Sequence, residues 1–453
     1  MDAGDILSKS FQLPPDRKEE YIKKANLILD SYSQMGYDAF TPGEIDFILG
    51  KEYLLKKSRE VNFPFLAANL IDKKTGSPLF APYLIKKVGG IKIAIFGVIM
   101  DQLSQDFYSR NPGLVIKDPI LTTKSLMSKL KKKSHLVIAL THQGLPNDKK
   151  LAREVSGIDI IIGAHSRSRL QKPIEVNDTI ILQTSGRGQR LGRLDLNLVD
   201  TKKPFNLVSF ARKTSLDKQI EYTRKEIDRF YEKSSGNDPF DFFKNDKKII
   251  ARLNALQKNE EEIEKKLEGL RGSNFYSNTL IPLGRKVKND FQVKKLIEDY
   301  KKEVIEIQKD KILSQAKLHK QSVDREKIST FFVGEQSCRK CHKKQSQLWK
   351  KTRHARAYQS LVKNDRHYEM ECIECHTTGY KERGGFFLLS RVERFKNVQC
   401  EACHGPGSLH KEKDGNIIKK VSRSTCLKCH NKERDPDFKY EDSLGKILMK
   451  INH

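Results

Sequence analysis

Polar helical segments and short apolar runs alternate over the first 212 residues of this 453-residue chain. The segment RKEEYIKKANLILDSYSQM repeats apolar residues with helical spacing after Asp16, which predicts a helix with that aspartate as its N-cap. Five later runs have the length of buried strands and end near a turn residue or a histidine: FLAANL, IKIAIFGVIM, HLVIALTH, IDIIIGAH and TIILQTS. This alternation predicts an α/β domain over residues 1–212.

Carboxylate, amide and imidazole side chains stand where these segments end. They are Asp5, Glu44, Asp46, Asn69, His142 and His165. Polar residues at the ends of buried strands commonly meet at one edge of a sheet, and carboxylates with imidazoles suit divalent metals that hold a phosphate and activate water. A single histidine is more often an ordinary core or surface residue, so the spacing alone leaves both interpretations open.

Residues 213–325 contain no cysteine and are rich in charge. The segment IIARLNALQKNEEEIEKKLEGL repeats leucine and isoleucine at spacings of three, four and seven, which indicates a helical seam. SSGNDP separates it from an earlier helix, and the later segment DFQVKKLIEDYKKEVIEIQKDKIL is a further helix that could pair back as a hairpin. We interpret 213–325 as a helical connector. A solvated spacer and a stalk that forms a homodimer both remain open.

All eight cysteines lie in the last part of the chain, as four pairs that each precede a histidine directly. The motifs CRKCH, CIECH, CEACH and CLKCH match the covalent attachment pattern of c-type haem, in which the thiols bond to the vinyl groups and the imidazole binds the iron. Zinc ribbons and disulfides, the alternatives for paired cysteines, leave the four histidines unexplained. We therefore predict four covalent haem c groups over residues 326–453. The attachment residues are Cys338, Cys341, Cys372, Cys375, Cys400, Cys403, Cys426 and Cys429, and the proximal iron ligands are His342, His376, His404 and His430.

A haem iron bound by two histidines needs a second imidazole on its far side, and this six-coordinate state suits electron transfer. Beyond the proximal histidines, this part of the chain offers His354, His367, His410 and His453. His410 follows His404 by only six residues, which makes it awkward for both to bind one iron from opposite faces. We therefore expect His410 to bind the iron of a neighbouring haem.

From FVGEQSCRKCHKKQSQLWKKTRHARAY through CIECHTTGY and VQCEACHGPGSLH to CLKCH and the final INH, the chain resembles the tetrahaem cytochrome c family that carries electrons in ammonia-oxidising bacteria. The resemblance implies a mostly helical and irregular domain that exchanges electrons with redox partner proteins. It also implies three distal ligands, His354, His410 and His453, which leaves one iron open. We assign the open iron to the haem of His376. His367 matches no ligand position of the family, and we expect it to be a surface residue.

The front half carries a second resemblance. In order and spacing, DAGDIL, MGYDAFTPGEIDF, FPFLAANL, VIALTHQG, DIIIGAHS and LQTSGRGQRLGRLDL resemble the metallophosphatase domain of periplasmic 5′-nucleotidases and UDP-sugar hydrolases. This implies an α/β sandwich, two divalent metal ions (zinc, manganese, iron or calcium) and a phosphate-ester or nucleotide substrate. By the resemblance, Asp5 would bridge the metals and His142 and His165 would bind them. Glu44 stands at the position of a metal-binding asparagine.

Three features depart from that family. Ile45 occupies the position of the catalytic histidine, and Arg167 occupies that of a polar metal ligand. The family's first motif, an Asp-x-His on the first strand, has no counterpart, and neither has the companion nucleotide-binding domain. Because c-type haems are attached after export, we expect the protein to start earlier, with a signal peptide and the missing strand, and to reside in the periplasm.

The chain carries 86 Lys and Arg against 58 Asp and Glu, a formal net charge of +28. The basic residues are spread along the whole length, which argues against a specific nucleic-acid groove and suits acidic redox proteins or a membrane surface. No apolar run approaches the roughly 20 residues that a membrane-spanning helix needs.

Together these features predict a multidomain protein: an α/β metallophosphatase-like sandwich, a helical connector and a tetrahaem cytochrome c domain. We expect an exported cytochrome that transfers electrons. Two alternatives assign a different task to the front domain. In the first, the front domain is an active metal-dependent phosphoester hydrolase, and the haems of the C-terminal domain sense redox state. In the second, the front domain is a catalytically inactive scaffold that carries the cytochrome.

Overall fold

The computed structural model divides into two compact units, residues 1–300 and 301–453, and each is described by itself. The described residues are 1–186, 188–199, 205, 207–284, 287–322, 330–364, 366–367, 369–380, 382, 385–386, 392–408, 410, 421–431, 434–435 and 437–443. Within these ranges, no helix combines the length and the apolar character needed to cross a lipid bilayer. The predicted domain boundaries at 212 and 325 stay predictions.

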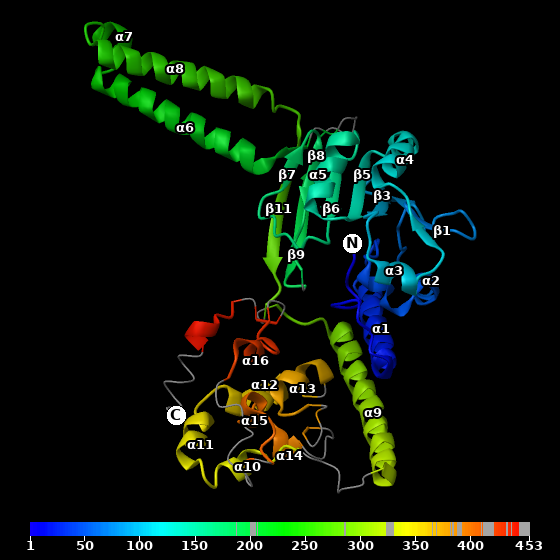
Figure 1. Ribbon diagram of the computed structural model, residues 1–453. Helices are drawn as coiled ribbons and strands as arrows, with labels where there is room; N and C mark the ends of the chain where they lie inside the picture. Colours follow the sequence, from blue (N-terminus) through cyan, green and yellow to red (C-terminus); the bar gives the residue numbers. More distant parts are fainter. Residues whose placement is uncertain are drawn as a thin grey trace. The chain divides into compact units, whose positions relative to one another are not determined.

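The first unit is built on a six-stranded sheet of order β2-β3-β5-β6-β8-β7, with a three-stranded sheet β10-β11-β9 and a short pair β1-β4 (Figure 1). Its elements in chain order are η1 (Pro15–Arg17), α1 (Lys18–Gln34), η2 (Ile45–Leu49), α2 (Lys51–Glu60), β1 (Leu70–Asp72), β2 (Tyr83–Val88), β3 (Ile91–Ile99), α3 (Gln105–Arg110), β4 (Leu114–Ile116), α4 (Pro119–Lys133), β5 (Leu136–His142), α5 (Leu145–Glu154), β6 (Ile160–Gly163), β7 (Ile174–Val176), β8 (Thr179–Leu182), β9 (Arg190–Asn197), β10 (Leu207–Ser209), α6 (Phe210–Lys233), α7 (Pro239–Phe242), α8 (Lys247–Glu268), β11 (Asn274–Pro282) and α9 (Phe291–Ser322).

The centre of the large sheet is parallel. Strands β3, β5, β6 and β8 pair in parallel, and the two edge strands β2 and β7 run antiparallel to their neighbours. Every residue of β5 is buried, as expected for a strand covered on both faces. Four of the five predicted strands are confirmed in this way. The fifth, FLAANL, forms only single bridges at Phe65 and Leu66 before β1 begins at its last residue.

Alternate residues of β5 enter two different hydrophobic clusters. Val137 and Ala139 pack with Leu130 of α4 and Leu151 of α5, so these helices cover one face of the sheet. The opposite face, with Leu136, Ile138 and Leu140, packs with Tyr276 of β11 and with leucines of β9. The first unit is therefore a layered α/β structure in which the small sheet lies on one face of the large one.

The predicted first helix forms as α1, but its start is shifted. The η1 turn precedes it and Arg17 holds the N-cap position without a side-chain cap, so the predicted cap at Asp16 is wrong. A proline at the start of η1, with its fixed backbone angle, favours an early turn at this point.

The range predicted to be a helical connector is not wholly helical. Helices α6 and α8 lie side by side as a long hairpin (Figure 1), joined by contacts such as Arg224 to Glu260 at 2.7 Å and Asn259 to Thr223 at 2.9 Å. The partner of α8 is thus the preceding helix, not the later one. After the hairpin, β11 returns to pair with β9 and β10. The hairpin is therefore an insertion between two strands of the first unit.

The second unit consists of short helices and irregular segments. Its elements, after the part of α9 that belongs to it, are α10 (Glu335–Cys338), α11 (Lys343–Lys350), η4 (His354–Arg356), α12 (Ala357–Lys363), α13 (Met370–His376), α14 (Val392–Phe395), α15 (Glu401–His404) and α16 (Arg423–Leu427). Among the described residues it has one cluster of buried apolar side chains: Phe332, Tyr358, Leu361, Ile373, Phe386 and Phe395.

Candidate metal centre and haem attachment sites

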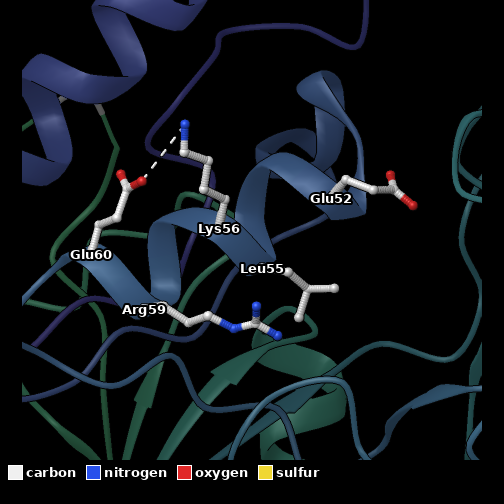
Figure 2. Close-up of a pocket in the computed structure, with 5 residues that line it drawn as sticks. All are labelled: Glu52, Leu55, Lys56, Arg59 and Glu60. Atoms are coloured by element: carbon white, nitrogen blue, oxygen red, sulfur yellow. Dashed lines mark ion pairs between the residues drawn. The ribbon is translucent and has the colours of Figure 1, made fainter.

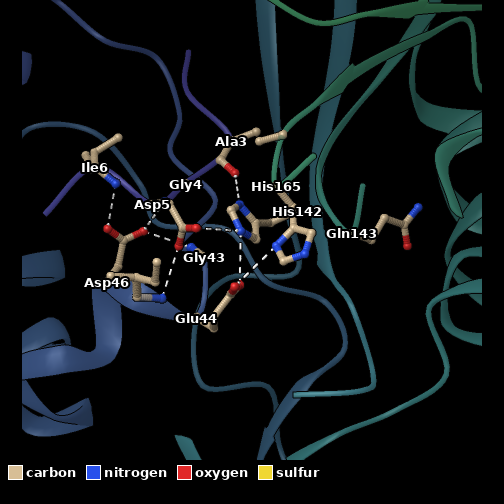
Figure 3. Close-up of polar contacts among 12 residues, drawn as sticks. Ala3, Gly4, Asp5, Ile6, Gly43, Glu44, Asp46, His142, Gln143 and His165 are labelled. Carbon is tan, nitrogen blue, oxygen red and sulfur yellow. Dashed lines mark hydrogen bonds and ion pairs between the residues drawn. The ribbon is translucent and has the colours of Figure 1, made fainter. Parts of the chain in front are cut away.

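Asp5, Glu44, His142 and His165 converge on one point of the first unit, with ligand atoms that all lie within 4.8 Å of one another (Figure 3). His142 Nε2 is 3.2 Å from Asp5 Oδ2 and 3.1 Å from Glu44 Oε2, and His165 Nδ1 is 3.2 Å from Glu44 Oε1. His142 ends β5 and His165 follows β6, so the parallel pairing of these strands brings both imidazoles to the same edge of the sheet.

Two glycines allow the loops to approach this closely. A Cβ atom on Gly43 would lie 2.3 Å from Asp5 Oδ1 and 2.5 Å from His142 Cε1. Gly4, with φ of +100°, adopts a backbone conformation that favours glycine, and its Cβ would lie 2.3 Å from the Gly43 nitrogen. Glycine is therefore required at both positions for the four side chains to meet.

Asp46 is not part of the ligand cluster but anchors the loops that carry it. Its carboxylate accepts backbone N–H groups of Asp5 at 2.7 Å, Ile6 at 2.8 Å, Leu7 at 2.9 Å and Gly43 at 2.8 Å. Burial and the nearby Asp5 raise the pKa of Asp46 to about 7, although these N–H donors favour the carboxylate. Asp46 thus fixes the loop of Asp5 against the loop of Glu44.

Asn69, the other polar residue noted at a strand end, also has a structural task. Its side-chain amide donates to Ile99 O at 2.7 Å and to Lys117 O at 3.0 Å, and its oxygen accepts the Ile99 N–H at 3.0 Å. It therefore joins β3 to the segment after β4 and contributes no ligand to the cluster.

The electrostatics of the cluster call for a cation. The Nδ1 atom of His142 lies 2.6 Å from Ala3 O and can donate its proton there. This leaves Nε2 facing two carboxylates, and neither Nε2 nor Glu44 Oε2 has a hydrogen-bond partner in the buried site. Burial lowers the pKa of His142, but Asp5 and Glu44 outweigh burial and raise it well above its usual value.

A metal ion fits this arrangement. Ligand atoms bound at about 2.0–2.2 Å around one tetrahedral ion lie roughly 3.3–3.6 Å apart, close to the separations between His142, Glu44 and Asp5. The hydrogen bond from His142 to Ala3 would fix the imidazole in the tautomer that presents Nε2 to a metal. Imidazole and carboxylate together suit zinc, iron or manganese.

Two of the departures noted in the sequence, Ile45 and Arg167, closely follow the cluster residues Glu44 and His165 along the chain. Ile45 donates its backbone N–H to Asp5 Oδ1 at 3.0 Å, but its side chain has no group that transfers a proton. Asp5, His165 and Arg167 have φ of 62°, 69° and 52°, a left-handed conformation that is uncommon for residues other than glycine. Such conformations persist where the surrounding structure enforces them, often at functional sites.

A surface pocket lies elsewhere, on α2. It is lined by Glu52, Leu55, Lys56, Arg59 and Glu60, and Lys56 forms an ion pair with Glu60 at 3.7 Å (Figure 2). These side chains are largely exposed and include no histidine or buried carboxylate. The candidate site of the first unit is therefore the Asp5 cluster.

In the second unit, the eight predicted attachment cysteines all lie among the described residues, and no disulfide joins any two of them. The thiols also meet between motifs: Cys338 of the first motif interacts with Cys400 of the third, and Cys375 of the second interacts with Cys429 of the fourth. The first and third motifs are thus neighbours, and so are the second and fourth.

Two pairs of histidines face each other. The rings of His342 and His410 lie 6.0 Å apart with an interplanar angle of 25°, and those of His354 and His430 lie 6.1 Å apart with an angle of 54°. Two imidazole nitrogens that bind one metal at about 2 Å lie about 4 Å apart, which places their ring centres about 6 Å apart. The separations fit an iron between each pair. His410 lies opposite His342, which belongs to another motif than His404, and its binding to a neighbouring iron stays a prediction.

In two of the predicted proximal histidines, the ring Nδ1 has a polar contact. His376 Nδ1 lies 2.6 Å from Ala357 O, and His430 Nδ1 lies 2.7 Å from Asp435 Oδ2. Such contacts fix the tautomer that leaves Nε2 for a metal. His453 lies outside the described residues. His367 lies beside the Tyr358 ring at 6.5 Å, and the open iron at His376 stays a prediction.

Comparison with known proteins separates the same two regions. Residues 337–405 match the family model described as cytochrome c554 and c-prime. Cytochrome c-554 of Nitrosomonas europaea is 33% identical over 24% of this chain and 54% of its own length. The 5′-nucleotidase of Vibrio cholerae is 33% identical over 39% of this chain and 38% of its own length.

Among solved structures, the 5′-nucleotidase precursor of Thermus thermophilus matches with a TM-score of 0.44 and 19% identity, over 67% of this chain and 49% of that chain. The matched part of the chain thus spans well under two thirds of the length of these relatives. It is similar to the 5′-nucleotidases in its front region and to the cytochrome c554 family in its C-terminal region.

Proposed function

We propose that this protein is an exported, periplasmic cytochrome that transfers electrons through four covalently attached haem c groups. The observation that carries the proposal is the pairing of His342 with His410 and of His354 with His430, each across a gap that fits an iron. Haem supplies the one-electron chemistry, and an iron held by two imidazoles reorganises little when it gains or loses an electron. The third distal ligand would be His453, and the haem of His376 would keep an open position.

The contacts between motifs support electron transfer within the second unit. Because Cys338 lies against Cys400 and Cys375 against Cys429, haems bonded to these thiols would have neighbouring edges. Electrons would pass within each such pair and then to a redox partner protein. The net charge of +28 favours a partner with an acidic surface.

The direct test is a pair of ligand variants in the purified holoprotein. His354→Ala and His410→Ala are each expected to convert one haem from low-spin to high-spin, seen by visible and electron paramagnetic resonance spectroscopy. His135→Ala, at a half-buried histidine of the first unit, is the control. Unchanged low-spin signals in both ligand variants would contradict the proposed ligand pairs.

A second candidate function, metal-dependent hydrolysis of a phosphate ester or nucleotide, is favoured by the Asp5 cluster. Asp5, Glu44, His142 and His165 would hold the metal, which supplies a Lewis acid and lowers the pKa of a bound water. The Ala3 carbonyl would orient His142, and Asp46 would hold the loops in register. The lack of a proton-transfer group at Ile45 instead favours a metal-binding scaffold without catalysis.

Metal analysis and an assay separate these alternatives. The purified protein, supplied with manganese or zinc, is tested for release of phosphate from 5′-AMP and from p-nitrophenyl phosphate, with His142→Ala as the matched variant. Metal bound by the parent but not by the variant, with turnover in the parent, supports the hydrolase. Metal bound without turnover supports the scaffold.

The predicted homodimer through 213–325 is tested by sedimentation of the whole chain.

A further inference from the structure

One carboxylate inside the third attachment motif has no part in binding haem by the roles given above. Glu401 lies between Cys400 and Cys403 and is only 4% exposed. Burial of a carboxylate is costly unless hydrogen bonds replace its water. A buried glutamate at this position therefore requires partners, and these show what it does.

The partners of Glu401 are three backbone N–H groups. Oε1 accepts from Val333 at 2.8 Å and from Gly407 at 2.7 Å, and Oε2 accepts from Gly334 at 2.7 Å. None of the ion pairs formed by lysines and arginines in the described part of the chain includes this carboxylate. Hydrogen bonds of this charge-assisted kind are stronger than neutral ones. Glu401 is therefore held by backbone amides from two separate segments.

The first segment leads into the first haem motif. Val333 and Gly334 directly precede α10, which ends at the attachment residue Cys338. Gly334 has φ of +80° and serves as N-cap of that helix. By binding the amides of Val333 and Gly334, Glu401 fixes the start of the helix that presents Cys338 and, four residues later, His342.

The second segment leads to His410. Gly407 lies against Glu401, since a Cβ on Gly407 would be 3.1 Å from Glu401 Oε1 and 3.0 Å from Val333 Cγ2. The next residue, Ser408, accepts the Phe331 N–H on its hydroxyl at 2.8 Å and donates its own N–H to Phe331 O at 3.2 Å. The two segments thus run alongside each other, with Glu401 at their junction.

Through these two segments, Glu401 positions both residues of the proposed ligand pair of the first haem. The hydrogen bonds to Glu401 fix the segment before α10, and with it His342. They also fix the loop at Gly407, and with it His410, and the two imidazole rings lie 6.0 Å apart. The charge of Glu401 also acts near the attachment thiols. Glu401 directly follows the attachment residue Cys400, which interacts with Cys338 of the first motif.

We propose that Glu401 is the positioning residue for the His342–His410 pair, and that it places a fixed negative charge beside the haems of the first and third motifs. The proposal rests on haem attachment as given under the proposed function, and it adds a residue that sets both ligation and reduction potential. A buried negative charge stabilises the oxidised iron, so it lowers the reduction potential of a nearby haem.

The test compares Glu401→Gln with Glu374→Gln in the full-length holoprotein. The glutamine keeps the size of the side chain but removes the charge and turns an N–H donor toward the amide of Gly334. Glu374 occupies a related place inside the second motif, yet its side chain is 58% exposed, so it is a matched control. Intact mass counts the haems, low-spin and high-spin signals report ligation, and a redox titration reports the potentials.

The expected result for Glu401→Gln is four bound haems, a partial or complete loss of one low-spin signal, and a higher potential for one or two haems. His410→Ala should give the same spin change, and the double variant should add none. Glu374→Gln should keep the spin signals of the parent. Four haems with parent-like spin signals and potentials would overturn the proposal, and so would loss of a haem, which would assign Glu401 to folding of the third motif. If the parent itself carried no haem, the proposed function would fail instead.

Discussion

The Asp5 cluster and the histidine pairs are held in place by very different surroundings. The cluster stands at the edge of a parallel sheet whose strands pack into two extended apolar clusters, with residues such as Phe96, Ala139 and Leu140 fully buried. The histidine pairs stand among short helices, where the described residues supply a single cluster of six buried side chains. The apolar core of the first unit stabilises the fold that positions the first site. In the second, the proposed haems would complete the core.

The largest expected effect follows from this contrast. If the full chain is produced without haem attachment, we expect the second unit to lose its fixed structure while the first unit keeps its sheet, because four absent haems remove much of the buried apolar surface. Hydrogen exchange by mass spectrometry checks this region by region. Strands β3 and β5 should stay protected and residues 330–431 should exchange fast. Equal protection in haem-free and holoprotein would contradict the contrast.

A smaller effect concerns a buried acid beneath the first site. Asp148 is fully buried, accepts hydrogen bonds from Thr141 at 2.7 Å and Gln143 at 3.1 Å, and leaves Oδ2 without a partner. Burial raises its pKa from 3.8 to about 7. Because the folded pKa lies above the unfolded one, the stabilising contribution is complete below about pH 4 and is lost as pH rises through about 7.

Asp148→Asn should remove this pH dependence. Relative to the variant, the parent is expected to lose up to about 4 kcal/mol of unfolding free energy between pH 4 and pH 8. Urea unfolding of the first unit, followed at several pH values within the full chain, measures the difference between the two curves. Parallel curves would show that Asp148 does not titrate in this range.

Removal of metal should change the stability of the first unit and leave the second unit unchanged. With metal at a hundredfold excess over its dissociation constant, the first unit is expected to gain about 2.7 kcal/mol from binding. Chelation should therefore lower the melting temperature of the first unit by several degrees and leave the haem spectrum unchanged. A shifted haem spectrum would indicate that the two sites are linked, contrary to this account.

The smallest effect is expected at the hairpin of α6 and α8. Arg224 forms ion pairs with Glu260 at 2.7 Å and Glu264 at 2.5 Å, but its side chain is 52% exposed. Exposed ion pairs contribute little to stability, so Arg224→Ala should change local hydrogen exchange in α8 slightly and leave both sites intact. Loss of haem or metal in this variant would mean that the hairpin supports the sites directly.

The sequence predicts much of both sites because their signals are local. The haem motifs are contiguous, and apolar runs mark β3, β5, β6 and β8, so the histidines that end or follow these strands were expected at one edge. The convergence of Asp5, Glu44, His142 and His165 follows from that placement. The sequence alone supplied four candidate distal histidines, and only the family resemblance selected three of them, because their partners lie far away in the sequence.

What the sequence did not predict depends on contacts between distant residues. Asp46 was grouped with the metal-site candidates, since nothing local shows that its carboxylate is saturated by N–H groups some 40 residues earlier. Strand β11 was assigned to the helical connector, because its residues NFYSNTLIP stand between two long helices and gain strand character from pairing with β9. Glu401 gave no sequence signal, since two of its three partners, Val333 and Gly334, lie 68 and 67 residues earlier in the chain.

The most direct test of the central claim is the intact mass of the native protein, followed by tandem mass spectrometry of its peptides. The account predicts the mass of the polypeptide plus four haems, with one haem on each peptide that carries a pair of cysteines and the histidine after it. A polypeptide without haem, or cysteine pairs joined as disulfides, would contradict it.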